Sequence, residues 1–142
     1  MKLTYFPSNL NILTQLLLID AKNKKLGKLA TLISLIVQGK HLLTYNNASI
    51  RKNNIIVINA SNIIISKRKL ITKVYYKHSN FIGGLKKENM KDLFLKTPSK
   101  LLKYSILKML PKNLSRDKLM QNIKIYPDTN HPYNLVPIKQ IN

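Results

Sequence analysis

The chain contains no cysteine and no tryptophan, and it has only four glycines in 142 residues. The absence of cysteine excludes disulfide bonds, thiolate metal sites and a cysteine nucleophile. Long apolar runs are also missing: the longest extends only from Leu29 to Val37 and contains Thr31 and Ser34. A membrane-spanning helix needs about twenty apolar residues, so we expect a protein that does not cross a membrane.

Acidic residues are scarce, with five Asp and Glu against 25 Lys and Arg. A two-metal nuclease would need most of those carboxylates in one site. The three histidines, His41, His78 and His131, are scattered and lack the fixed local spacing of metal ligands. We therefore predict a protein that is not an enzyme, with no catalytic residue, no metal site, no cofactor and no small-molecule substrate.

The excess of basic residues gives a formal net charge of +20. These residues are spread from Lys2 to Lys139, so the folded domain itself is the polycation. Such a domain repels itself and binds a polyanion, most commonly nucleic acid, with release of counterions. The apolar fraction of 44% is sufficient for a packed core. Charge alone leaves a basic architectural DNA-binding protein as the alternative to an RNA-binding protein.

The first half of the chain alternates between two hydrophobic patterns. Continuous apolar runs at 16–19 and 54–59 predict buried strands, and 63–65 predicts a continuation or a third strand. Between the first two, apolar residues recur at helical spacing over 26–37, with Gly39 as the stop. They suit packing against a sheet better than binding to an anionic lipid surface. The order predicts an α/β fold: a single compact domain whose mixed central sheet of about four strands has helices packed on both faces.

The second half is predicted to be mainly helical, after a further strand at 74–76. Asn89 and Asp92 resemble a capping arrangement, and Thr97 with Pro98 predicts the start of a helix. The apolar face of that helix, which ends at Pro111, consists of Leu102, Ile106 and Met109. Ser115 is predicted to cap a short last helix, followed by a final strand at 123–126. We divide the chain into an N-terminal extension (1–15), the α/β domain (16–126) and an extended C-terminal tail (127–142).

The segment from Lys73 to Lys87, KVYYKHSNFIGGLKK, is the strongest candidate for contact with nucleic acid. Its glycine pair, Gly83 and Gly84, would let backbone N–H groups approach a phosphate between flanking lysines. Tyr76 or Phe81 could stack on a base. The structural alternative is a strand and a glycine turn with a solvated lysine face and core aromatics.

Together with this segment, several other short motifs occur in a characteristic order from about Leu16 to the end of the chain. They are LIDA (18–21), LGKLAT (26–31), GKH (39–41), TY (44–45), VINA (57–60), KMLPKN (108–113), KIY (124–126) and HP (131–132). In these segments the chain resembles the large-subunit ribosomal protein L13 family, in its bacterial and organellar form. Departures are Lys28 and Lys77 at positions where arginine is usual, Lys108 in place of a glycine, and SIRKNN (49–54) in place of an acidic, glycine-containing turn.

The resemblance implies a domain embedded in large-subunit ribosomal RNA that joins the subunit early and helps to fix the fold of the RNA. Its other partners would be neighbouring large-subunit ribosomal proteins. Carried over onto this chain, the RNA-facing surface comprises Lys24, Lys28, Lys40, His41, Lys77, His78, Gly83, Gly84, Lys86, Lys112 and Arg116. To these we add the adjoining basic residues Lys25, Lys67, Arg68, Lys69 and Lys87.

Lysine, asparagine and isoleucine, the residues of A/T-rich codons, are abundant and indicate an A/T-rich genome. The first fifteen residues show no alternating basic amphipathic pattern, so a cleavable presequence is not predicted. We expect the ribosome of an organelle, a plastid more than a mitochondrion, or otherwise the cytoplasm of an A/T-rich bacterium.

Overall fold

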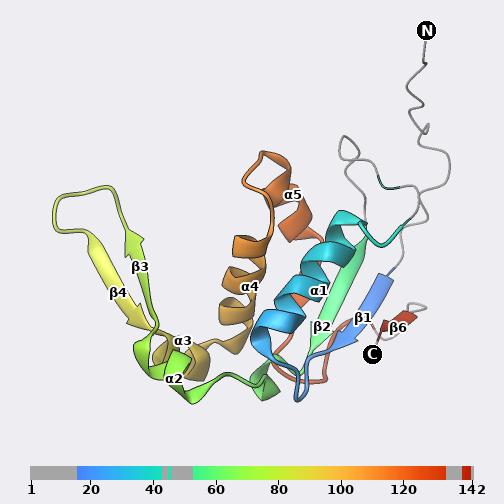
Figure 1. The fold of residues 1–142 in the computed structure, drawn as a ribbon, viewed down its shortest axis with the longest axis horizontal. Helices are drawn as coiled ribbons and strands as arrows, with labels where there is room; N and C mark the ends of the chain where they lie inside the picture. The colour runs from blue at the N-terminus through green and yellow to red at the C-terminus, as the bar shows by residue number, and fades with distance from the viewer. Residues whose placement is uncertain (1–15, 43–44, 46–52, 134–138, 142) are drawn as a thin grey trace, which may run out of the picture.

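The computed structural model describes residues 16–42, 45, 53–133 and 139–141 (Figure 1). The predicted N-terminal extension and residues 49–52 of the altered turn lie outside the described residues. The elements are β1 (Leu16–Asp20), α1 (Leu26–Gln38), β2 (Asn54–Ile58), the 3-10 helix η1 (Ala60–Asn62), α2 (Lys67–Thr72), β3 (Val74–His78), β4 (Leu85–Asn89), α3 (Met90–Lys96), α4 (Pro98–Met109), α5 (Ser115–Gln121), β5 (Ile123–Ile125) and β6 (Lys139–Ile141).

Four strands form one sheet in the order β5–β2–β1–β6, and every pairing in it is parallel. Where the sequence predicts a mixed sheet, the structure confines antiparallel pairing to the separate β3–β4 sheet. The reason lies in the connections: helices join β1 to β2 and β2 to β5, and such crossovers return the chain in the same direction. Part of the predicted extended tail also enters the sheet, because β6 pairs with residues 17–19 of β1.

Helix α1 confirms the predicted helical spacing: its buried residues include Leu29, Ile33 and Val37. Gly39 ends the helix with φ of 73°, a left-handed conformation in which glycine carries no steric penalty. The buried amide of Asn53 donates a hydrogen bond of 3.1 Å to the carbonyl of Ile36, one of the last carbonyls of α1. The end of α1 therefore depends on the left-handed backbone of Gly39, and the side chain of Asn53 satisfies one of the last carbonyls of the helix.

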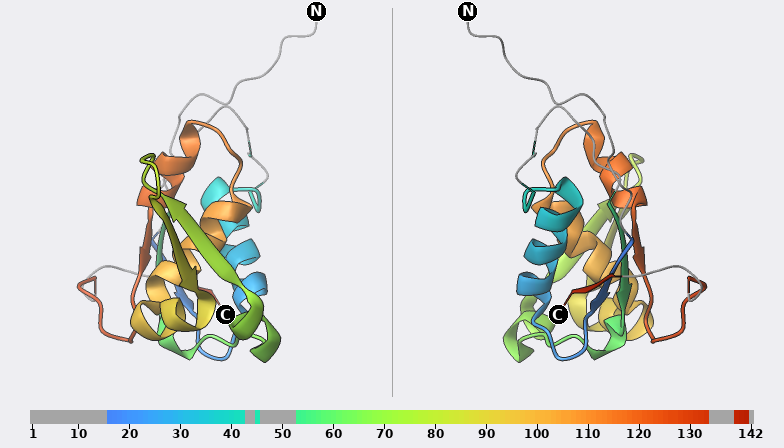
Figure 2. Two further views of the ribbon diagram at one scale, coloured as in Figure 1. Left: turned by 90° about the vertical axis from the view of Figure 1, so that its left-hand side faces the viewer. Right: turned by 90° about the vertical axis from the view of Figure 1, so that its right-hand side faces the viewer.

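The main core lies between the sheet and α1 and α4, which run side by side over one face (Figure 1 and Figure 2). Leu17 and Ile19 of β1, with Ile55 and Val57 of β2, join the buried side chains of α1, α4 and α5 in one cluster. Successive strand residues point to opposite faces. The sequence predicts helices on both faces. In the described part, the helices that share this cluster gather on the face of the odd-numbered strand residues.

The predicted strand at 74–76 exists as β3, and it pairs with β4 alone, in a hairpin that projects from the body (Figure 1). We call residues 74–89 the hairpin arm. Its base rests on a small second cluster of buried residues, Met90, Leu93 and Leu101. Tyr75 of β3 and Tyr104 of α4 pack against this cluster, and their rings stack with centroids 5.8 Å apart.

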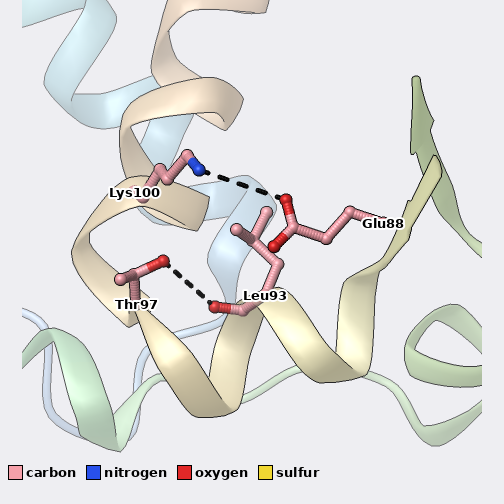
Figure 3. Close-up of polar contacts among 4 residues, drawn as sticks. All are labelled: Glu88, Leu93, Thr97 and Lys100. Atoms are coloured by element: carbon pink, nitrogen blue, oxygen red, sulfur yellow. Dashed lines mark hydrogen bonds and ion pairs between the residues drawn. The ribbon is translucent and has the colours of Figure 1, made fainter. Parts of the chain in front are cut away.

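Polar contacts also link the arm to the body through α3 and α4 (Figure 3). Lys100 Nζ of α4 lies 4.0 Å from Glu88 Oε2 of β4. Thr97 occupies the predicted N-cap position of α4, but its hydroxyl donates back to the Leu93 carbonyl of α3 at 3.5 Å and does not cap α4. Asn89 similarly precedes α3 without capping it, since its amide donates to the Asp92 carboxylate at 3.4 Å.

Three local predictions need correction. Residues 63–65 are not a strand, because β1 and β5 already occupy both sides of β2, and Ile64 makes only an isolated bridge to Lys25. Met109, in the last turn of α4, is exposed and is not on the buried face with Leu102 and Ile106. Ser115 is the first residue of α5 and not its cap. The strand predicted at 123–126 is present as β5.

Candidate nucleic-acid interface

Besides Asp92, two of the few acidic side chains, Asp20 and Glu88, make contacts within the protein. Asp20 accepts hydrogen bonds from the Asn59 amide at 2.8 Å and from the Lys22 backbone N–H at 2.9 Å. Burial raises the pKa of Asp20, but these bonds and the charges of Lys24 and Lys22 together hold it below its ordinary value. Glu88 faces Lys100, the single ion pair among the described residues. No other described lysine forms an ion pair, so most of them are available to an external anion.

The hairpin arm brings two of the predicted residues directly together. Lys77 on β3 is the cross-strand partner of Lys86 on β4, and both side chains are exposed. Directly opposed like charges destabilise a strand pair. This arrangement is relieved when an anion, such as a phosphate, lies between the two ammonium groups.

The opposite face of the arm combines aromatic and basic side chains. Tyr76 is 63% exposed, and the Nζ of its cross-strand partner Lys87 lies 5.9 Å from the ring centroid. His78 follows on the same face, and its Nδ1 accepts a hydrogen bond of 3.0 Å from the Asn80 N–H. Because Nδ1 accepts this bond, the proton of the neutral ring is on Nε2.

The glycine pair has a structural role in the loop of the arm. Gly83 has φ of 75°, and a Cβ on Gly84 would collide with the Ser79 hydroxyl and lie 2.9 Å from the Phe81 carbonyl oxygen. The Gly84 N–H donates to that same carbonyl at 2.9 Å. It is therefore used within the loop, so the glycine pair shapes the turn that presents Phe81 and Ile82. Phe81 is 77% exposed and Ile82 is fully exposed, which is unusual for side chains of this size.

The basic triplet at 67–69 forms the first turn of α2 and is not the loop or hairpin considered as its alternative. Lys67, Arg68 and Lys69 are all exposed. Lys69 and the predicted Lys25 line a groove of about 720 Å³ between the start of α1, α2 and α4. The residue triplet and the start of α1, distant in sequence, are thus neighbours in the fold.

The remaining predicted residues divide between the two ends of the helices. Exposed Lys28 and half-buried Lys24 lie at the start of α1. Exposed Lys40 and His41 follow its end, about 20 Å away for a helix of this length. At that second end lies the α4–α5 connection (Figure 1), which carries exposed Lys112. The predicted surface therefore consists of separate basic patches on several sides of the molecule.

Arg116 differs from the other predicted residues because its guanidinium is partly enclosed. Its Nε is buried and has no hydrogen-bond partner among the described residues. A buried donor without a partner costs about 1–3 kcal/mol. An anion bound by the guanidinium at this position would reduce that cost.

Several lysines outside the predicted set occupy comparable positions. Lys73 and Lys108 line the same groove as Lys25 and Lys69. A second, shallower groove of about 540 Å³ between α4 and β5 is lined by Lys100, Lys103 and Lys124. Three of these five residues come from α4, and both grooves depend on how elements that are distant in sequence pack together.

The described residues also bear on two other classes of function. No helix among them is both long and apolar enough to span a bilayer. In the same part of the chain, no group of three or more histidine and acidic side chains is placed to hold a metal ion.

Comparison with known proteins accounts for most of the chain. The family model "Ribosomal protein L13" matches residues 14–132. "Large ribosomal subunit protein uL13" of Chloroflexus aggregans (strain MD-66 / DSM 9485) is 40% identical over 115 residues, which cover 81% of this chain and 80% of that protein. The protein of the same name from Buchnera aphidicola subsp. Schizaphis graminum (strain Sg) is 36% identical, with 81% of each chain covered. "Large ribosomal subunit protein uL13c" of Gracilaria tenuistipitata var. liui is 37% identical over 82% of this chain and 81% of its own length. This chain therefore belongs to the ribosomal protein L13 family.

Proposed function

We propose that the protein is a structural, non-catalytic component of the large ribosomal subunit that binds large-subunit ribosomal RNA and helps to organise it during assembly. Its relatives carry the name of a large-subunit protein, which supports the assignment to that subunit. The Lys77–Lys86 pair on the projecting arm is the observation that supports a phosphate polymer as the ligand, and the family of the relatives favours RNA over DNA. Neighbouring large-subunit proteins are the other expected partners.

The mechanism is electrostatic clamping by a rigid body. The sheet with α1 and α4 fixes the relative positions of the basic patches at both ends of α1 and on α2, and the hairpin arm adds a further patch. Each patch neutralises phosphates of a different RNA segment, so binding holds those segments in one arrangement. Lysine suits this role because a compact ammonium ion binds phosphate as a point charge, without the bidentate geometry of arginine.

Salt dependence tests the electrostatic mechanism. If roughly 6–10 phosphates are neutralised, affinity for large-subunit RNA should fall about 10³- to 10⁵-fold between 50 and 200 mM salt. Filter binding over that range measures the slope. A flat response would exclude clamping through phosphates.

Sedimentation of a native lysate tests the assignment to the ribosome. Co-migration with large subunits through a high-salt wash is the expected result, and the fraction that holds those ribosomes identifies the compartment. We propose an organellar ribosome, a plastid more than a mitochondrion; relatives occur in both bacteria and plastids. Recovery with DNA, or only in light fractions, would replace the ribosomal role with that of a basic architectural DNA-binding protein.

A further inference from the structure

The groove between the start of α1, α2 and α4 combines two chemical features. Its rim carries four lysines, Lys25, Lys69, Lys73 and Lys108, and none of the described residues that line it is acidic. Its floor is apolar and aromatic, made by Leu26, Ile65, Met90, Tyr75 and Tyr104. The volume of about 720 Å³ lies within the range of about 300–1,000 Å³ that small-molecule sites occupy.

The aromatic floor has polar atoms placed for a ligand. Lys73 Nζ lies 5.3 Å from the ring centroid of Tyr75, so a phosphate on this lysine would be next to the ring. The Tyr75 hydroxyl is buried and has no hydrogen-bond partner among the described residues. Burial raises the pKa of Tyr75, so the hydroxyl keeps its proton.

The opposed lysines of the arm, Lys77 and Lys86, lie beyond the groove along the strand that carries Tyr75. Tyr75 and Lys77 are two residues apart on β3, so they point to the same side of the hairpin, about 7 Å apart along the strand. A chain of phosphates that leaves the groove therefore meets Lys77 and Lys86 next. The ligand that fits is a polymer with a flat apolar group beside each phosphate.

We infer that this groove binds one unpaired nucleotide of the RNA, with its base against Tyr75 and Tyr104 and its phosphate on the lysine rim. The inference rests on the proposed function and adds a base-recognition site to it. Base stacking on aromatic side chains is the usual way in which proteins hold unpaired RNA nucleotides. The absence of acidic side chains from the lining favours a phosphate-bearing ligand, and the aromatic floor favours a base over an acidic peptide.

The test uses the full-length protein and transcribed large-subunit ribosomal RNA. Tyr104→Leu should weaken binding roughly 5- to 150-fold, the fold-change that corresponds to about 1–3 kcal/mol for one stacked base. Tyr104→Phe keeps the ring and should bind like the wild type. Ultraviolet cross-linking of the wild-type complex should place a nucleotide on the peptide that contains Tyr75 or Tyr104.

A charge-matched pair of variants keeps the test valid if Tyr104→Leu does not fold. K73Q/K108Q removes two rim lysines, whereas K96Q/K118Q removes two exposed lysines outside the groove. The first should bind RNA more weakly than the second at the same net charge. Equal affinities for the two double variants, with cross-links outside the groove, would overturn the groove inference. In that case, RNA binding by the wild type would still uphold the proposed function. Failure of the wild type to bind this RNA overturns both, and carboxylate cross-links from Lys73 or Lys108 to another protein overturn the nucleotide assignment.

Discussion

Reversal of one charge in the Lys77–Lys86 pair should change RNA binding and arm stability in opposite directions. In the free protein, Lys77→Glu replaces two opposed positive charges with an attractive cross-strand pair. Such a pair contributes roughly 0.2–1 kcal/mol, and exposure to solvent keeps it near the lower end of that range. The arm should therefore become more stable, not less.

The expected size follows from this energy. A gain of about 0.2–1 kcal/mol slows amide hydrogen exchange in β3 and β4 roughly 1.4- to 5-fold, if exchange occurs through opening of the arm. RNA affinity should decrease because one phosphate contact is lost and a carboxylate faces the RNA. The slope of log affinity against log salt should become shallower by about 1. Filter binding and hydrogen exchange on the same preparation measure both effects.

Lys118→Glu is the matched control, since Lys118 is exposed on α5 and lies outside the predicted surface. It changes the net charge equally, so it measures the loss of affinity that comes from overall charge alone. In the double variant K77E/K86E, like charges face each other again, and the protection gained by Lys77→Glu should disappear. The reasoning is refuted if Lys77→Glu and Lys118→Glu bind RNA equally, or if Lys77→Glu loosens the arm.

Three further predictions concern the folded state. Gly84→Ala should distort the loop of the arm, because the added Cβ would lie 2.9 Å from the Phe81 carbonyl oxygen. NMR spectra should show changes limited to residues 74–89. A spectrum identical to that of the wild type would contradict the loop geometry. Leu102→Ala removes a fully buried core side chain and should lower the free energy of unfolding by about 2–5 kcal/mol in urea titrations; a loss below 1 kcal/mol would place this residue outside the core. The pKa of Asp20 is lower in the folded protein than its ordinary value of 3.8, so the ionised carboxylate stabilises the fold above that pH. This contribution to stability is lost as the pH falls through the folded pKa. Asp20→Asn should therefore be less stable than wild type at pH 6, and the difference should shrink as the pH falls below 3.8, as measured by chemical denaturation; a difference that does not change with pH would refute this linkage.

The sequence predicts the elements of the first half well because their signals are local. The apolar run at 16–19 and the helical spacing after Leu26 each depend on one segment, and Gly39 ends α1 as expected. The pairing of strands depends on segments far apart. Residues 63–65 are as apolar as a strand, but the positions beside β2 belong to β1 and β5.

The sequence likewise predicts those parts of the candidate surface that come from one segment, but not those that distant elements form together. The lysines of the arm, such as Lys77 and Lys86, are close in sequence, and a hairpin around the glycine pair brings them into register. Lys25 and Lys69 come from different elements, and their shared groove exists only after α1, α2 and α4 have packed. The buried Nε of Arg116 also has no signal in the sequence, because it results from the packing around α5.

The small base of the hairpin arm has a consequence for where electrostatic repulsion acts. The body is held by an extensive core, whereas the arm rests on three buried side chains, the stacked tyrosines and one exposed ion pair. Mutual repulsion of the many lysines is relieved most easily by movement of the least anchored element. Without RNA, we expect the arm to sample several orientations while the sheet and its helices keep one structure. If ribosomal RNA is the ligand, as proposed, it supplies the counter-charge that selects one orientation, and the shape of this part of the protein is then specified jointly by the protein and by its ligand.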